Sequence, residues 1–141
     1  VIFVILPNLP GSGINGATKK IGQNVMLMVN DRRFYSDTFW FTLFHEIGHI
    51  INGDYGITFE NEHAGQEDAD KYAEDKLIPP GEYEAFVRMN EFSENAVRRF
   101  AERIDRDPGI VLGRLQNDQI VPFTNVALSK ALKHKYKVIT S

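Results

Sequence analysis

The 141-residue sequence contains no cysteine. Disulfide frameworks, zinc sites built on thiolates and cysteine nucleophiles are therefore excluded, and any metal ion must be held by nitrogen and oxygen ligands. Long hydrophobic runs are also missing. The apolar opening at residues 1–6 is too short for a membrane span or a signal peptide and has no charged segment before it. We therefore expect no membrane association.

Positive charge is not in excess either. The chain has 16 lysine and arginine residues against 19 aspartate and glutamate residues, for a net charge of −3. This balance argues against direct nucleic-acid binding by this chain, and the basic residues at 130–137 are interpreted as a solvated helix end. A phosphate-binding glycine loop and a serine in a nucleophile elbow are also missing.

The arrangement of apolar segments predicts an α+β fold. Branched apolar runs separated by short turns indicate strands at residues 1–6, 13–21 and 25–29, and hence a small antiparallel sheet. Residues 54–62 are expected to form a loop. Helices are expected at residues 63–77, 80–89, 93–104, 107–116 and 126–136. The length fits a single domain over residues 1–141. Because the chain starts inside a strand without methionine, we expect a fragment of a longer protein.

The most informative segment is the H-E-x-x-H motif formed by His45, Glu46 and His49. It lies in an apolar helix that is expected to start at Ser36 or Asp37 as the cap and to end before a glycine, with apolar residues on nearly all sides. Histidines four residues apart share one helix face and can bind one metal ion, while the glutamate activates a water. The alternative is an ordinary buried helix with two hydrogen-bonded histidines.

A catalytic zinc ion needs a third protein ligand and leaves a fourth position for water. The helix after the motif is the natural source. On that helix, Gln66 and Asp70 border the expected buried face, whereas Glu67 points away from its centre. Glu62 reaches this face only if the helix starts earlier. The residues alone leave these possibilities open.

These motifs together resemble a known family. Residues 39–50, FWFTLFHEIGHI, are similar to the metallopeptidase domain of the ImmA/IrrE family, in the form found C-terminal to a helix-turn-helix in HigA-like antitoxins and phage-type regulators. The resemblance covers nearly the whole chain. Further matching stretches lie at residues 15–18, 69–73, 77–80 and 109–116.

The resemblance implies a zincin-like fold of the gluzincin type, with the motif helix at its centre. It implies that His45 and His49 bind zinc and that Glu46 is the general base. The family's third ligand is a glutamate, and this sequence has Gln66 at that position. Gln66 itself, Glu67 or Glu62 would then supply the third ligand. Asp70 matches the acid that orients a histidine ligand in the family.

The resemblance also implies a function: a cytoplasmic zinc-dependent endopeptidase that cleaves a regulatory protein such as a repressor. The departure at Gln66 favours an alternative, a non-catalytic sensing or interaction domain of a helix-turn-helix regulator or a toxin–antitoxin antitoxin, with a toxin or partner regulator as its ligand. The sequence offers four candidates for stabilising an oxyanion and does not choose among them: Tyr55, His63, Tyr72 and Tyr83.

Overall fold

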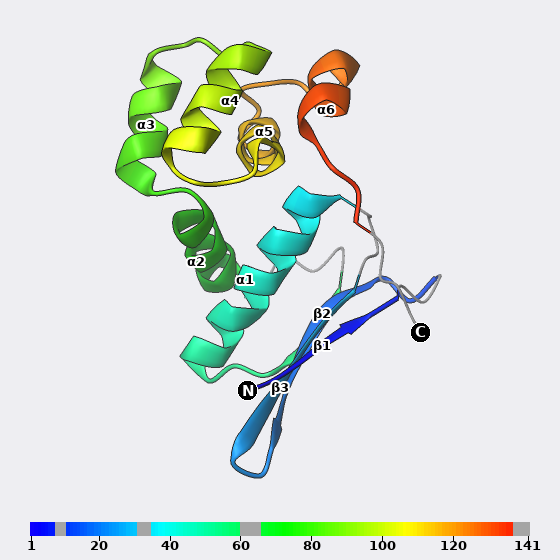
Figure 1. The fold of residues 1–141 in the computed structure, drawn as a ribbon. Helices are drawn as coiled ribbons and strands as arrows, with labels where there is room; N and C mark the ends of the chain where they lie inside the picture. The colour runs from blue at the N-terminus through cyan, green and yellow to red at the C-terminus, as the bar shows by residue number, and fades with distance from the viewer. Residues whose placement is uncertain (8–10, 31–34, 60–65, 137–141) are drawn as a thin grey trace.

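The computed structural model describes residues 1–7, 11–30, 35–59 and 66–136. In these ranges the chain forms an α+β fold with one mixed four-stranded sheet and six helices (Figure 1). The strands are β1 (Ile2–Leu6), β2 (Ile14–Ile21), β3 (Asn24–Asn30) and β4 (Gly56–Phe59). The helices are α1 (Ser36–Asn52), α2 (Glu67–Leu77), α3 (Pro80–Arg88), α4 (Glu94–Arg103), α5 (Pro108–Asn117) and α6 (Val126–Leu132).

The sheet is mixed, so the expectation of an antiparallel sheet was wrong. Its strand order is β1-β3-β2-β4. β2 and β3 form an antiparallel hairpin around Gly22, whose φ of +58° suits glycine at a tight turn. β1, β2 and β3 do alternate in direction, but β3 inserts between β1 and β2. It therefore runs parallel to β1, pairing Phe3 with Leu27.

The fourth strand lies in a segment that was expected to be a loop. β4 pairs antiparallel with β2, and the backbone N–H of Gly56 donates to the Thr18 hydroxyl at 3.2 Å. Four residues starting with glycine give almost no alternating pattern from which to predict a strand. The pairing partner is nearly forty residues away, so this strand depends on tertiary structure.

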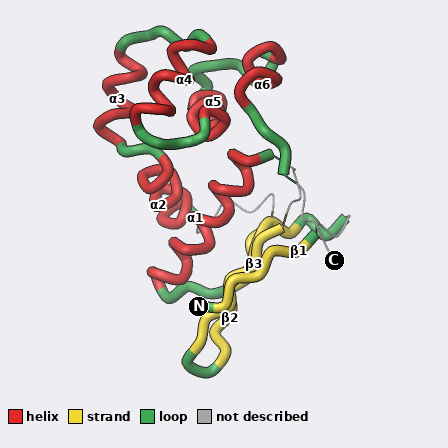
Figure 2. The backbone as a smooth tube through the Cα atoms, viewed as in Figure 1, coloured by secondary structure: helices red, strands yellow, loops and turns green. Residues whose placement is uncertain are grey.

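Helix α1 lies between the sheet and the other helices, as Figures 1 and 2 show. It contacts β2 and β3 on one side and α2 and α5 on the other. The sheet face against α1 carries the buried residues Gly16, Thr18, Leu27 and Val29. The predicted central position of the motif helix is therefore confirmed. No helix in the described ranges is long and apolar enough to cross a membrane.

The two ends of α1 differ in how well the sequence predicts them. Gly53 ends the helix in the left-handed conformation, φ +70°, as expected. At the start, however, neither predicted cap is the cap. The N-cap is Tyr35, without a side-chain hydrogen bond. Ser36 is buried and its N–H donates to the carbonyl of His134, while the Asp37 carboxylate pairs with Lys133 at 3.3 Å. Distant parts of the chain thus determine how this helix begins.

The last part of the chain, residues 77–132, forms what we call the helical body. α4 and α5 start where capping chemistry predicts: the Ser93 hydroxyl accepts from the Ala96 N–H, and the Asp107 carboxylate accepts from the Gly109 N–H. α6 ends at Leu132, earlier than expected. The predicted start of α2 at residue 63 lies outside the described residues, and the described helix starts at Glu67. The helical body holds most of the apolar core, including Leu77, Ile78, Phe86, Val97, Phe100, Val111, Leu112, Leu115 and Leu132.

Candidate metal centre

Helix α1 presents both histidines of the motif on one buried face. His45 and His49 are 5% and 6% exposed, and their Nε2 atoms lie 3.1 Å apart. Gly48 between them allows α2 to approach closely, because a Cβ there would lie 3.1 Å from the Cα of Ala69. The absence of a side chain at this position brings the start of α2 near the histidines.

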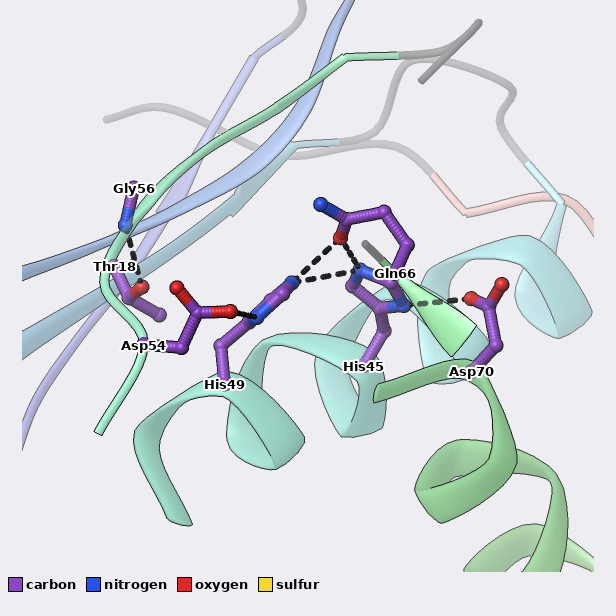
Figure 3. Close-up of polar contacts among 7 residues, drawn as sticks. All are labelled: Thr18, His45, His49, Asp54, Gly56, Gln66 and Asp70. Carbon is purple, nitrogen blue, oxygen red and sulfur yellow. Dashed lines mark hydrogen bonds and ion pairs between the residues drawn. The ribbon is translucent and has the colours of Figure 1, made fainter. Parts of the chain in front are cut away.

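Gln66, the N-cap residue of α2, completes the cluster. Its Oε1 lies 2.8 Å from Nε2 of His45 and 2.7 Å from Nε2 of His49, so three polar atoms converge (Figure 3). Glu67 is exposed at the first residue of α2 and has no contact with the histidines among the described residues. Glu62 and His63 lie outside the described residues. The structure therefore brings Gln66 to the histidines, where the family resemblance expects a glutamate.

Each imidazole also contacts a carboxylate through its other nitrogen. Nδ1 of His45 lies 2.8 Å from Asp70, and Nδ1 of His49 lies 3.2 Å from Asp54, as Figure 3 shows. A carboxylate paired with a histidine in this way fixes the ring orientation and makes the opposite nitrogen a better ligand. Asp70 was a candidate from the sequence. Asp54 was missed, because it lay in a segment expected to be a loop.

The protonation of this cluster follows from its partners. An ionised carboxylate only accepts hydrogen bonds, so Nδ1 of each ring carries a proton and donates it. A neutral ring then has a lone pair at Nε2. With Gln66 Oε1 pointing the same way, three lone pairs then meet. This is repulsive unless a metal cation lies between them or one ring takes a second proton and donates it to Oε1. Rotating the amide by 180° gives a metal-free solution, since its NH₂ group can donate to both rings.

The electrostatics of His45 favour positive charge at this cluster. Burial acts to lower the pKa of His45. Hydrogen bonds with Asp70 and Gln66 and the charges of Asp70 and Glu46 more than offset this, and the pKa is raised. The carboxylates that raise this pKa also attract a metal cation, and a proton on Nε2 competes with the metal for the same lone pair.

Glu46 is fully buried beside the histidines. Neither of its carboxylate oxygens has a hydrogen-bond partner among the described residues. Burial raises its pKa. The Thr58 hydroxyl and both histidines act in the opposite direction, although Thr58 does not reach full hydrogen-bond geometry. Gly16 of β2 provides the space, because a Cβ there would lie 2.8 Å from Oε1 of Glu46. A buried carboxylate without a partner is costly, and such groups concentrate where chemistry requires them.

The donor atoms fit a zinc ion in part. A tetrahedral zinc ion with bonds of about 2.0–2.1 Å holds nitrogen and oxygen ligands roughly 3.3 Å apart. The three atoms of His45, His49 and Gln66 lie 2.7–3.1 Å apart and need only a small expansion. Within the described ranges no three residues among histidine, cysteine, aspartate and glutamate form a metal-binding group, because an amide takes the third place. An amide oxygen is a weaker ligand than a carboxylate and does not offset the charge of the ion.

The tyrosines considered for oxyanion stabilisation have different surroundings. Tyr83 donates to Asp118 at 2.6 Å within the helical body, where Arg114 lies over its ring. Burial and the hydrogen bond with Asp118 raise its pKa strongly. A Cβ at Gly48 would lie 3.3 Å from the ring of Tyr72, so that ring packs against α1. Tyr55 is 39% exposed just after the α1 turn. The Tyr83 hydroxyl is thus already engaged by Asp118 within the helical body.

Comparisons with protein-family models and with curated proteins gave no match.

Proposed function

We propose that this chain is a zinc-dependent endopeptidase domain in which His45, His49 and Gln66 hold the metal ion. The observation that carries the proposal is the convergence of two imidazole nitrogens and the Gln66 side-chain oxygen, with each imidazole contacting its own carboxylate. A metal ion at the centre would bind all three atoms at once. The zincin-like, gluzincin-type fold belongs to the same proposal, supported by the α+β architecture and the central motif helix.

The proposed chemistry is the addition of water to a peptide carbonyl. Zinc, when bound, supplies a Lewis acid that polarises this carbonyl and makes water more acidic. Glu46 accepts the proton of the attacking water and then delivers it to the leaving amine. Its raised pKa suits this role, because a carboxyl group must hold the proton between the two steps. Asp70 keeps His45 in the required orientation throughout.

The proposed substrate is a regulatory protein, such as a repressor, cleaved in the cytoplasm. This part of the proposal rests on the resemblance to the ImmA/IrrE family. The acidic net charge of −3 agrees with a domain that acts on proteins and leaves DNA binding to another region.

A second function is favoured by one specific observation, the amide at the third ligand position. If the NH₂ group of Gln66 donates to both Nε2 atoms, the cluster is satisfied without metal and simply joins α1 to α2. The domain would then be a non-catalytic sensing or interaction module of a helix-turn-helix regulator or antitoxin. Its ligand would be a toxin or partner regulator.

The metal content of the protein separates the two functions. Protein purified without chelator should contain about one zinc ion per chain, and His49→Ala should lose it. Gln66→Glu should raise the affinity for zinc, because it adds a charged ligand at the same position. Zinc near zero in the wild type, restored by Gln66→Glu, would contradict the enzyme as the sequence stands and support the sensing module.

Cleavage is tested with a matched substitution. Glu46→Gln should retain zinc and lose hydrolysis of the protein substrate by about 10²-fold or more, because it removes the proton acceptor. Loss of zinc from Glu46→Gln would mean that the carboxylate is part of the metal binding itself.

A further inference from the structure

We infer that Asp54 is a positioning residue for His49 and increases the zinc affinity of the site. The inference rests on the proposed function, because it concerns the same metal. Its basis is the contact between Nδ1 of His49 and Oδ2 of Asp54 at 3.2 Å. This contact gives His49 what Asp70 gives His45: a fixed ring and a more basic Nε2 atom.

The turn that ends α1 places Asp54 accurately. Gly53 adopts φ +70°, a conformation that L side chains rarely adopt. The next N–H, from Asp54, donates to the carbonyl of His49 at 2.8 Å. Asp54 is therefore joined to His49 twice, once by its backbone and once by its side chain. On the far side of the turn, Gly56 is anchored to the Thr18 hydroxyl at 3.2 Å.

The location of Asp54 at the end of α1 is slightly unfavourable in electrostatic terms. The C-terminus of a helix carries a partial negative charge, so a carboxylate directly after it is repelled. The hydrogen bond from Nδ1 of His49 to the carboxylate offsets this repulsion. An ordinary surface acid would gain more at the other end of the helix.

The exposure of the two acids predicts which matters more. The Asp54 side chain is 64% exposed and that of Asp70 is 41% exposed. Water competes more strongly for Asp54, and its contact is also the longer one. Substitution of such supporting residues weakens metal binding by about 10–100-fold. We expect Asp54→Ala near the lower limit, about 10-fold, and Asp70→Ala nearer the upper limit.

The experiment is a zinc titration of the whole chain against a chromophoric chelator. Asp54→Ala should weaken zinc binding about 10-fold, and Asp54→Asn should fall between it and the wild type, because the amide oxygen still accepts a hydrogen bond. Asp68→Ala removes an exposed acid of α2 and is the matched control, with affinity expected to be unchanged. The melting temperature of zinc-free Asp54→Ala should not fall below that of the zinc-free wild type, which separates positioning from a structural role.

A second variant moves the carboxylate without removing it. Gly53→Ala strains the left-handed turn and should also weaken zinc binding. If the wild type binds zinc and Asp54→Ala binds it within about twofold as tightly, the inference is overturned while the proposed function stands. If only Gln66→Glu binds zinc, the same comparison is made in that background. Absence of zinc from both proteins would overturn both proposals.

Discussion

The helical body and the sheet with α1 bury different kinds of side chain. Most of the buried apolar residues lie in the helical body, where Phe86 and Phe100 stack at 4.3 Å between ring centroids. The sheet contributes only Leu27 and Val29 to the buried apolar set of the described residues. Among the buried polar residues the distribution is reversed: all but Gln116 belong to the sheet or α1.

Most of the apolar stabilisation therefore lies in the helical body, and the proposed site lies in the region that buries polar groups. Buried polar groups contribute little or cost free energy, whereas buried apolar side chains each contribute a few kcal/mol. Trp40, Phe41 and Phe44 of α1 pack against the helical body. Helix α1 is therefore packed against the helical body by its aromatic residues. Its buried carboxylate, Glu46, lies on the side that faces the sheet. A site built this way exchanges stability for function.

The largest expected effect contrasts one residue from each region. Leu112→Ala in α5 removes a fully buried side chain and should lower the free energy of unfolding by about 2–5 kcal/mol. With zinc chelated, His45→Ala should lower the free energy of unfolding by less than half as much as Leu112→Ala does. The side chain that it removes is polar, and burying a polar group contributes little to stability. Urea denaturation with chelator present measures both. Equal losses of unfolding free energy in the two variants would contradict the contrast between the apolar helical body and the polar site.

The next effect concerns the space beside Glu46. Gly16→Ala puts a methyl group 2.8 Å from the carboxylate and should destabilise the protein by about 1–3 kcal/mol while displacing Glu46. Gly56→Ala is the matched control in the neighbouring strand, since nothing lies within 4 Å of its Cβ position. Thermal denaturation of both variants checks this. If Gly16→Ala is as mild as Gly56→Ala, Glu46 is not held as described.

A smaller and opposite effect is expected from Glu46→Gln. Replacing a buried carboxylate that has no partner with a neutral amide should stabilise the zinc-free protein by about 1 kcal/mol. The same substitution is expected to abolish the proposed hydrolysis, so at this residue stability and the proposed activity change in opposite directions. Chemical denaturation in the presence of chelator gives the value. A loss of stability would show that the carboxylate has a structural partner.

The smallest expected effect is a pH dependence at the border of the helical body. Burial raises the pKa of Glu74, and the nearby Arg114 only partly counteracts this. The pKa of Glu74 is therefore higher in the folded than in the unfolded protein. Its contribution to the free energy of unfolding is complete below the unfolded-state pKa and is lost as the pH rises through the folded-state pKa. Glu74→Gln should remove this loss. The unfolding free energies of the wild type and Glu74→Gln, measured from pH 4 to 7, should therefore converge at the acidic end. Parallel curves would contradict the raised pKa of Glu74.

The sequence predicts the parts that depend on local chemistry. The end of α1 at Gly53 and the starts of α4 and α5 follow from capping residues in their own segments. The helix ends and starts named here need no knowledge of distant contacts. Periodicity places Gln66 at the border of the buried face of its helix, and its contact with the histidines is a tertiary one.

The features that the sequence does not predict depend on residues far away in the chain. The insertion of β3 between β1 and β2 is determined by sheet packing, and β4 exists only through its pairing with β2. The start of α1 at Ser36, with Tyr35 as its N-cap, depends on the hydrogen bond from the Ser36 N–H to the carbonyl of His134. Asp54 could have been found from one signal: an acid directly after a glycine helix end, five residues beyond His49.

The most direct test of the account is X-ray absorption at the zinc edge, on protein purified without chelator. The account predicts about one zinc ion per chain, bound by two imidazoles and by oxygen ligands at about 2.0–2.1 Å. His49→Ala should lose one imidazole or the metal altogether. Protein that contains no zinc, or zinc whose spectrum shows a single imidazole, would contradict the claim that His45, His49 and Gln66 form a metal centre.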